Sequence, residues 1–177
     1  MSILEAGVAG TTMEDVRAAA GVSSSQIYHY LADKHALVNA VIDRQADNII
    51  GIHEPVLTAI EGLDGLRAWR DMIVAIQQQA GCRGGCPIGS LGSELADSDE
   101  PARLAVVAGF GRWEAAIRNC LRQMQARGQL APGADADDLA LATLAALQGG
   151  LLLTQIEKST RPLEKALDAM ISLIGRA

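Results

Sequence analysis

Hydrogen-bonding side chains are concentrated in the stretch from Thr11 to Leu37. Hydroxyl, amide, imidazole and ammonium groups contact phosphate oxygens and base edges in protein–DNA complexes. The candidates for DNA contact are Thr12, Ser23, Ser24, Ser25, Gln26, Tyr28, His29, Tyr30 and Lys34. Gln26 and His29 are the candidates for base contacts, because a glutamine amide can pair with adenine, and Lys34 is the candidate for a phosphate contact. The alternative is structural: the serines only cap helices and the tyrosines only pack.

The local sequence predicts two short helices that would present these groups. Thr12 can cap the first helix with Asp15 three residues later, and Ser23 can cap the second with Gln26, which makes two capping boxes. Gly21 stands between them, where a helix end favours a residue that tolerates positive φ. This is the pattern of a helix–turn–helix, whose second helix enters the major groove of DNA.

Three segments of this stretch resemble the DNA-binding domain of TetR-type transcriptional repressors. They are Gly-Val-Ser at 21–23, Ile-Tyr-His-Tyr-Leu at 27–31 and Asp-Lys-His-Ala-Leu at 33–37. The resemblance implies a three-helix DNA-binding head over residues 1–45 and a larger helical body over residues 46–177, which binds an effector and dimerises. It further implies a homodimeric, ligand-responsive repressor that binds a palindromic operator and is released by a small-molecule effector.

Two departures from the family pattern lie in the head. Leu31 stands where the family usually has an aromatic residue, and a full helix usually precedes Thr11. Here Ser2 to Ala6 resembles only the start of that helix. We therefore expect the first helix to be shortened in this sequence and the natural protein to be longer before Thr11.

The remaining sequence predicts an all-α fold. Apolar residues recur at steps of three and four, without the alternation of a β-strand. Helices are expected at 34–50, 55–60, 64–81, 88–97, 98–127, 139–156 and 160–174, with a break around Gly51, His53 and Pro55. Asp33, Asp64, and Ser98 or Asp97 are the expected caps of three of these helices.

The charge balance weighs against non-specific nucleic-acid binding. The formal net charge is −6, and residues 1–50 hold three basic and six acidic side chains. A specific DNA-binding protein remains compatible with this balance. The acidic head also leaves open a helical dimer that no longer binds DNA and serves as a ligand-binding or interaction module.

The predicted body contains a second candidate site. Large side chains are scarce, with aromatic residues at only 3%, and they concentrate on two predicted helices, where they could line an apolar pocket. The candidate effector-binding residues are Trp69, Met72, Phe110, Trp113, Ile117 and Gln148. The alternative is an ordinary hydrophobic core, with Gln148 bonding across a dimer interface.

Cys82 and Cys86 stand four residues apart in a glycine-rich loop. A thiol-redox-sensing regulator is the alternative function that this pair suggests, although a structural loop is the preferred interpretation. Two thiols are too few for a zinc site. The sequence predicts no metal site, no cofactor, no catalytic residues and no enzyme, since it lacks a phosphate loop and a nucleophile elbow. Three cysteines and no secretory signal predict a cytoplasmic protein.

The segment 139–156 carries no charge. Its length is at the short end for a membrane span, and polar residues interrupt it, so we expect a buried helix and no membrane partner. It would form a four-helix bundle with the last helix and the same two helices of a second copy. The predicted dimer residues are Leu147, Gly149, Gly150, Leu151, Leu163, Leu167, Met170 and Ile174.

Overall fold

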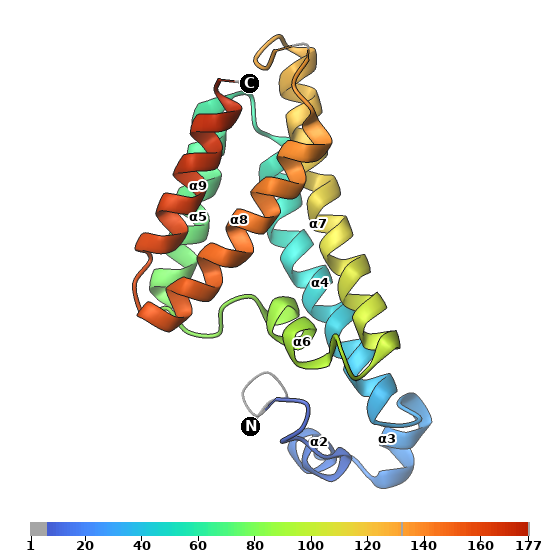
Figure 1. Ribbon diagram of the computed structural model, residues 1–177. Coiled ribbons are helices and arrows are strands. Elements are labelled where there is room, and N and C mark those ends of the chain that lie inside the picture. Colours follow the sequence, from blue (N-terminus) through green and yellow to red (C-terminus); the bar gives the residue numbers. More distant parts are fainter. Residues whose placement is uncertain (1–6, 132, 177) are drawn as a thin grey trace. The chain divides into compact units, whose positions relative to one another are not determined.

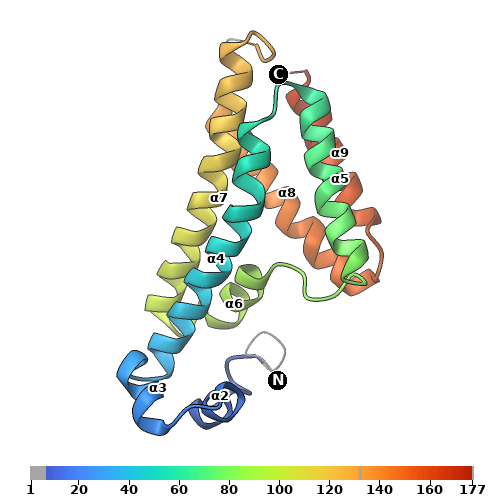
Figure 2. The same ribbon diagram turned by 180° about the vertical axis from the view of Figure 1, so that it is seen from behind.

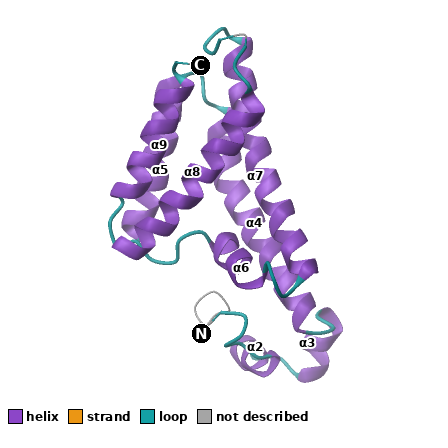
Figure 3. Cartoon of the chain, viewed as in Figure 1, coloured by secondary structure: helices purple, strands orange, loops and turns teal. Residues whose placement is uncertain are grey.

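The computed structural model describes residues 7–131 and 133–176. Within these ranges the chain is helical and contains no strand, which confirms the predicted all-α fold (Figure 3). The helices are α2 (Met13–Ala20), α3 (Ser24–Tyr30), α4 (Lys34–Thr58), α5 (Leu63–Gln79), α6 (Pro87–Leu95), α7 (Glu100–Ala126), α8 (Ala136–Glu157) and α9 (Arg161–Ile174) (Figure 1). The expected start of a first helix at Ser2–Ala6 lies outside the described residues.

The chain divides into two compact units. The first comprises Met1–Asp47 and Pro87–Phe110, and the second comprises Asn48–Cys86 and Gly111–Ala177. The long helices α4 and α7 each contribute to both units. The predicted boundary at residue 45 lies close to the first of these divisions, but α6 and the beginning of α7 group with the head.

The core of the first unit lies where α6 and α7 meet the first half of α4. Its buried apolar side chains include Val38, Ile42, Ile88, Leu91, Leu95 and Val106. Two glycines permit close approach. A Cβ added at Gly109 would lie 3.2 Å from the Cβ of Ala46, and one at Gly92 would lie 3.0 Å from Val106 Cγ1. This unit is therefore tightly packed around α6 and α7.

The core of the second unit is built mainly on α8 and α9, which lie side by side, with α9 also against α5 (Figures 1 and 2). Leu147 and Leu151 of α8 and Leu163 and Leu167 of α9 are buried. A Cβ added at Gly150 would lie 2.8 Å from the Cα of Leu163. The two helix backbones thus approach too closely at this point for any larger residue.

The predicted break at Gly51, His53 and Pro55 is wrong, because α4 continues to Thr58 with Pro55 inside it. A proline in a helix removes the bond to the carbonyl four residues earlier, here that of Gly51. Gly51 is exposed, so water can satisfy that carbonyl. His53 and Leu57 are buried and continue the apolar stripe of α4, which favours the helix over a break.

The predicted caps were partly correct. Asp33 accepts a bond from the N–H of Ala36 (2.8 Å), as expected. The cap of α7 is Asp99, which accepts from the N–H of Ala102 (3.0 Å), and not Ser98 or Asp97. α5 begins after Gly62 without a side-chain cap, so Asp64 lies in its first turn. An acidic residue is favourable in either place because both are near the positive end of the helix dipole.

Candidate functional site

The two predicted capping boxes are both present in the helix–turn–helix. Thr12 Oγ1 accepts from the N–H of Asp15 (3.2 Å), and the Asp15 carboxylate accepts from the N–H of Thr12 (2.9 Å). Gly21 ends α2 with φ 65°, in the left-handed region that the sequence predicted. The hydrogen bonds of Thr12 lower the pKa of the Asp15 carboxyl, so this box is fully formed with Asp15 ionised.

The second box begins α3. Ser23 Oγ accepts from the N–H of Gln26 (3.2 Å), while Gln26 Oε1 accepts from the N–H of Ser23 (2.8 Å). Ser25 Oγ lies 3.1 Å from Ser23 Oγ. Because the box occupies the amide oxygen of Gln26, two-point pairing of Gln26 with adenine would require this side chain to leave the box.

Most of the surface of α3 is open to solvent. Its only buried residue is Ile27, and the side chains of Ser24, Ser25 and His29 are exposed. Tyr28 is 53% exposed and Tyr30 is 83% exposed, which weighs against the interpretation that the tyrosines only pack. The ring of His29 meets the ring of Tyr30 edge-on, with centroids 4.9 Å apart.

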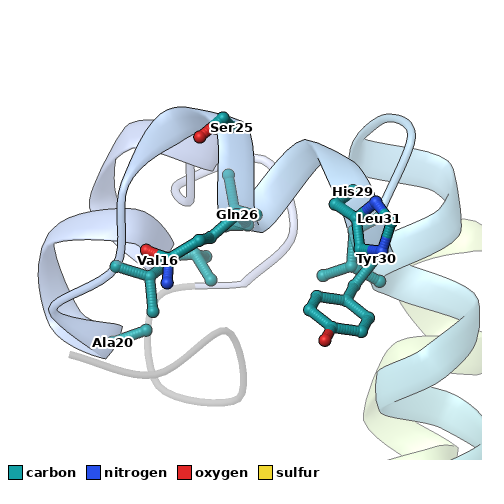
Figure 4. A pocket seen from close by; sticks show the side chains of 9 residues that line it. Val16, Ala20, Ser25, Gln26, His29, Tyr30 and Leu31 are labelled. Carbon is teal, nitrogen blue, oxygen red and sulfur yellow. The ribbon is translucent and has the colours of Figure 1, made fainter.

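A hollow of about 540 Å³, which was not predicted from the sequence, lies along α2 and α3 (Figure 4). Val16 and Ala20 of α2 line it together with Gln26, His29 and Tyr30 of α3. None of the residues of α2 is buried. The inner side of the helix–turn–helix is thus incompletely covered by the described part of the chain.

The cations of the head differ in their availability. Arg17 forms an ion pair with Glu14 and donates to the carbonyl of Val22 (3.4 Å). The hydrogen bonds of this pair lower the pKa of Glu14 and raise that of Arg17. Lys34 is half-buried and is the first residue of α4. Because Glu14 and the carbonyl of Val22 already engage the guanidinium of Arg17, Lys34 is better placed than Arg17 to contact a phosphate.

A cluster of three rings lies in the second unit. Trp69 Nε1 donates to Nδ1 of His53 (3.0 Å), and the His53 ring lies 4.6 Å from the ring of Trp113, measured between centroids. All three residues are buried. Burial lowers the pKa of His53 from 6.5 to about 4, so His53 is neutral at pH 7. Because Nδ1 accepts the bond, the proton of the neutral ring is on Nε2.

The remaining effector candidates have different surroundings. Ile117 is buried one helical turn beyond Trp113, while Met72 and Gln148 are half-buried. Phe110 is half-buried and belongs to the first unit. Several buried polar atoms of the second unit lack a hydrogen-bond partner among the described residues, and they include Gln77 Oε1, Trp113 Nε1, Gln148 Nε2 and Thr154 Oγ1. Such atoms are costly unless a ligand or water satisfies them.

His53 was not among the candidate site residues predicted from the sequence. Its signal was present, because Ile42, Ala46, Ile50, His53 and Leu57 recur at steps of four and three. A buried tryptophan also needs an acceptor for its ring N–H, and His53 supplies one for Trp69.

All three cysteines are buried and form no disulfide. Cys82 has φ 54°, an uncommon conformation for a non-glycine residue, and its carbonyl accepts from Nζ of Lys158 (3.4 Å). Burial raises the pKa of the Cys120 thiol to about 11, which makes it a poor nucleophile. The buried state of Cys82 and Cys86 disfavours the redox-sensor alternative, since sensor thiols are accessible. No cluster of metal-binding side chains occurs among the described residues.

Most of the predicted dimer residues lie inside the single chain. Leu147, Gly150, Leu151, Leu163, Leu167 and Ile174 are buried within a single chain, where α8 packs against α9. Met170 is half-buried, and Gly149 is exposed with no atom within 4 Å of an added Cβ. Because α8 is apolar on all sides, its sequence did not reveal which side meets α9. The exposed large apolar residues of these two helices are Leu141, Leu152, Leu153 and Ile156 of α8 and Leu173 of α9.

Two parts of the chain match protein families. Residues 1–41 match the family described as bacterial regulatory proteins, tetR family, and residues 62–170 match the family described as tetracyclin repressor-like, C-terminal domain. Together these matches include both the helix–turn–helix and most of the second unit.

Curated relatives and solved structures are similar over nearly the whole chain. The HTH-type transcriptional repressor DhaR of Mycobacterium sp. is 24% identical, over 97% of this chain and 85% of the relative. The transcriptional regulator AcuR of Cereibacter sphaeroides is 25% identical, over 91% and 74%. A TetR transcriptional regulator from Chloroflexus aurantiacus has a TM-score of 0.81 and 29% identity, over 97% and 87%. The regulatory protein TetR from Rhodobacter sphaeroides has a TM-score of 0.83 and 23% identity, over 96% and 95%, and shows the same fold.

Proposed function

The chain belongs to the tetR family of bacterial regulatory proteins, and from this premise we propose that it is a repressor that binds a palindromic operator as a homodimer and is released by a small-molecule effector. The observation that carries the proposal is α3, a recognition helix that begins with a capping box and has only Ile27 buried. The match of residues 1–41 to a DNA-binding family weighs against a helical module without DNA-binding activity.

The DNA-binding face combines phosphate contacts with base contacts. The exposed hydroxyls of Ser24, Ser25 and Tyr28 and the ammonium of Lys34 are suited to phosphate oxygens. His29 is exposed on α3 and is the side chain with the least hindered access to a base edge, because Gln26 is held in its capping box. Such contacts are local, so the negative net charge of the chain does not prevent them.

The effector would bind near the ring cluster of Trp69, His53 and Trp113. His53 is neutral, and the buried polar atoms that lack partners include both donors and an acceptor. Because none of the three rings carries a charge, the cluster offers no counter-charge to a charged effector buried against it, which is unfavourable. We therefore expect a neutral effector that carries both hydrogen-bond donors and acceptors.

The homodimer would form on the outer sides of α8 and α9. Leu141, Ala145, Leu152 and Ile156 recur at helical spacing along the exposed side of α8. By length and composition α8 could also span a bilayer. Its other side is packed against α9 inside the chain, and a second copy would cover the exposed side as a four-helix bundle.

Selection of binding sites from a random DNA library, performed with the wild-type protein at low salt, tests the function. We expect an enriched palindrome, and the absence of any enriched sequence would contradict the proposal. With the selected operator, Lys34→Ala should weaken binding to all sequences alike and reduce the salt dependence by about one phosphate contact. His29→Ala should instead change which bases are preferred.

A separate experiment tests the proposed dimer surface. Leu152→Glu places a charge on the exposed side of α8 without disturbing the buried side, so it should give a folded monomer that no longer binds the operator. Sedimentation measures whether the variant is a monomer, and circular dichroism measures whether it is folded. A dimeric Leu152→Glu variant would exclude this surface.

A further inference from the structure

Two acidic side chains flank the turn between α6 and α7. Glu94 lies in the last turn of α6, and Asp99 caps the start of α7. Both belong to the same compact unit as the helix–turn–helix. Each carboxylate contacts a different end of the helix–turn–helix.

Glu94 holds the segment that precedes α2. Its Oε2 accepts from the N–H of Val8 (3.0 Å), and its Oε1 accepts from the N–H of Ala9 (2.9 Å). Gly7 has φ 74°, and a Cβ added there would lie 3.2 Å from Glu94 Oε2. Thr11 closes the same turn by donating to the carbonyl of Gly7 (2.8 Å). The backbone of this turn is therefore shaped around the carboxylate of Glu94.

Asp99 holds the segment that follows α3. Its Oδ2 lies 2.6 Å from Nδ1 of His35, the second residue of α4. The bond from the N–H of Ala102, and then the bond from His35, lower the pKa of Asp99, so its carboxylate is ionised and accepts from His35. His35 is adjacent to Lys34, the proposed phosphate contact.

The α6–α7 turn, which carries both carboxylates, lies between two well-packed helices. Leu91 and Leu95 of α6 are buried, and Gly92 lets α6 approach Val106 of α7 closely. In contrast, α2 buries none of its residues and α3 buries only Ile27. Hydrophobic packing therefore fixes the α6–α7 turn far better than it fixes the helix–turn–helix.

We propose that Glu94 and Asp99 are positioning residues for DNA binding, which hold the two ends of the helix–turn–helix in the orientation that fits the operator. This inference rests on the proposed function. The two carboxylates are also a liability, because negative charge in a DNA-binding unit repels phosphate. Their positioning effect has to exceed that repulsion.

Neutralising each carboxylate separates repulsion from positioning, because the two effects change the affinity for DNA in opposite directions. Glu94→Gln removes a negative charge and can keep only one of the two backbone bonds. Asp99→Asn removes a negative charge but keeps a residue that caps helices well. Repulsion alone predicts tighter DNA binding for both variants. Positioning predicts weaker binding, by about tenfold for each if about 1.4 kcal/mol of binding free energy is lost.

Glu100→Gln is the matched control. Glu100 stands next to Asp99, is exposed, and pairs with Arg103 on its own helix. This variant removes the same charge from the same turn without releasing the helix–turn–helix. Its affinity for the operator should be unchanged or slightly higher.

The measurement is the dissociation constant of the selected operator, with its salt dependence, for wild type, Glu94→Gln, Asp99→Asn and Glu100→Gln. We expect weaker binding only for the first two variants, with an unchanged salt slope because no phosphate contact is lost. Faster amide exchange at Val8 and Ala9 in free Glu94→Gln would show the released segment directly. Binding by Glu94→Gln and Asp99→Asn as tight as that of Glu100→Gln overturns the inference.

A double-mutant cycle provides a test that does not depend on Glu94. His35→Gln and Asp99→Asn should each weaken binding, and the combined variant should be no weaker than the worse of the two, because they break the same contact. Additive losses would overturn the role of Asp99. Failure of the wild-type protein to select any operator would instead overturn the proposed function on which the inference rests.

Discussion

The helix–turn–helix and the pair formed by α8 and α9 are stabilised in different ways. α2 and α3 together bury one residue, Ile27. The start of each helix is stabilised by a capping box whose two residues are three positions apart. α8 buries eight residues and α9 buries four. The first region keeps its polar groups available to a partner, whereas the second region uses its side chains to hold the chain together. The difference suggests that the two regions respond to quite different substitutions.

The largest effect is expected in the packed region. Leu167→Ala should reduce the free energy of unfolding by about 3 kcal/mol, because it leaves a cavity at a side chain that is 1% exposed. Ser172→Ala on the same helix is exposed and serves as the control, with little expected change. Urea unfolding at fixed protein concentration measures both. Equal losses for the two variants would contradict the division of roles.

Acidification should also destabilise the second unit, to which His53 of α4 belongs. His53 has a pKa of about 4 in the folded chain and 6.5 without burial, so the unfolded chain binds its proton first as the pH falls. The contribution is complete above pH 6.5 and is lost as the pH falls to about 4, which amounts to about 3 kcal/mol. His53→Gln can still accept from Trp69 but cannot titrate, so its unfolding free energy should fall less over this interval. A parallel decline in both proteins would exclude His53 as the cause.

Two adjacent glycines of α8 give opposite predictions. Gly150→Ala should destabilise the chain by about 2 kcal/mol, because its Cβ would meet the backbone of Leu163 at 2.8 Å. Gly149→Ala should stabilise the helix by up to about 1 kcal/mol, since its added Cβ meets no atom within 4 Å. Thermal unfolding of both variants compares them. A loss for Gly149→Ala together with dissociation of the dimer would place Gly149 at a close contact between copies.

The smallest effect is expected in the helix–turn–helix. Ser23→Ala removes the acceptor for the N–H of Gln26 and should cost about 1 kcal/mol of local helix stability. Amide exchange should become faster in α3, with the protection of α8 and α9 unchanged. Ser24→Ala, inside the helix and exposed, is the control. Loss of protection throughout the chain would mean that α3 is not locally stabilised.

The sequence was sufficient to predict structure where both partners of an interaction are close in the chain. The boxes of Thr12 with Asp15 and of Ser23 with Gln26 span three residues each, so the residue types and spacing specify them. The all-α fold follows in the same way from helical periodicity. The roles of these residues in DNA contact remain predictions.

Sequence alone was insufficient where the partner is distant. His53 and Pro55 resembled a helix break because the bond from Trp69, sixteen residues away, could not be anticipated. Tertiary burial then outweighed the unfavourable local effect of proline. The side of α8 that meets α9 was equally ambiguous, and the bonds of Glu94 to Val8 and Ala9 join residues more than eighty positions apart.

The ring cluster around His53 has a practical consequence. The chain contains two tryptophans, and both contact His53. The tryptophan emission of the whole protein therefore originates from one small buried volume, which gives the molecule an intrinsic optical reporter at the proposed effector position. A compound that displaces or polarises these rings would change the emission spectrum of unlabelled protein, so a chemical library could be screened without any attached dye.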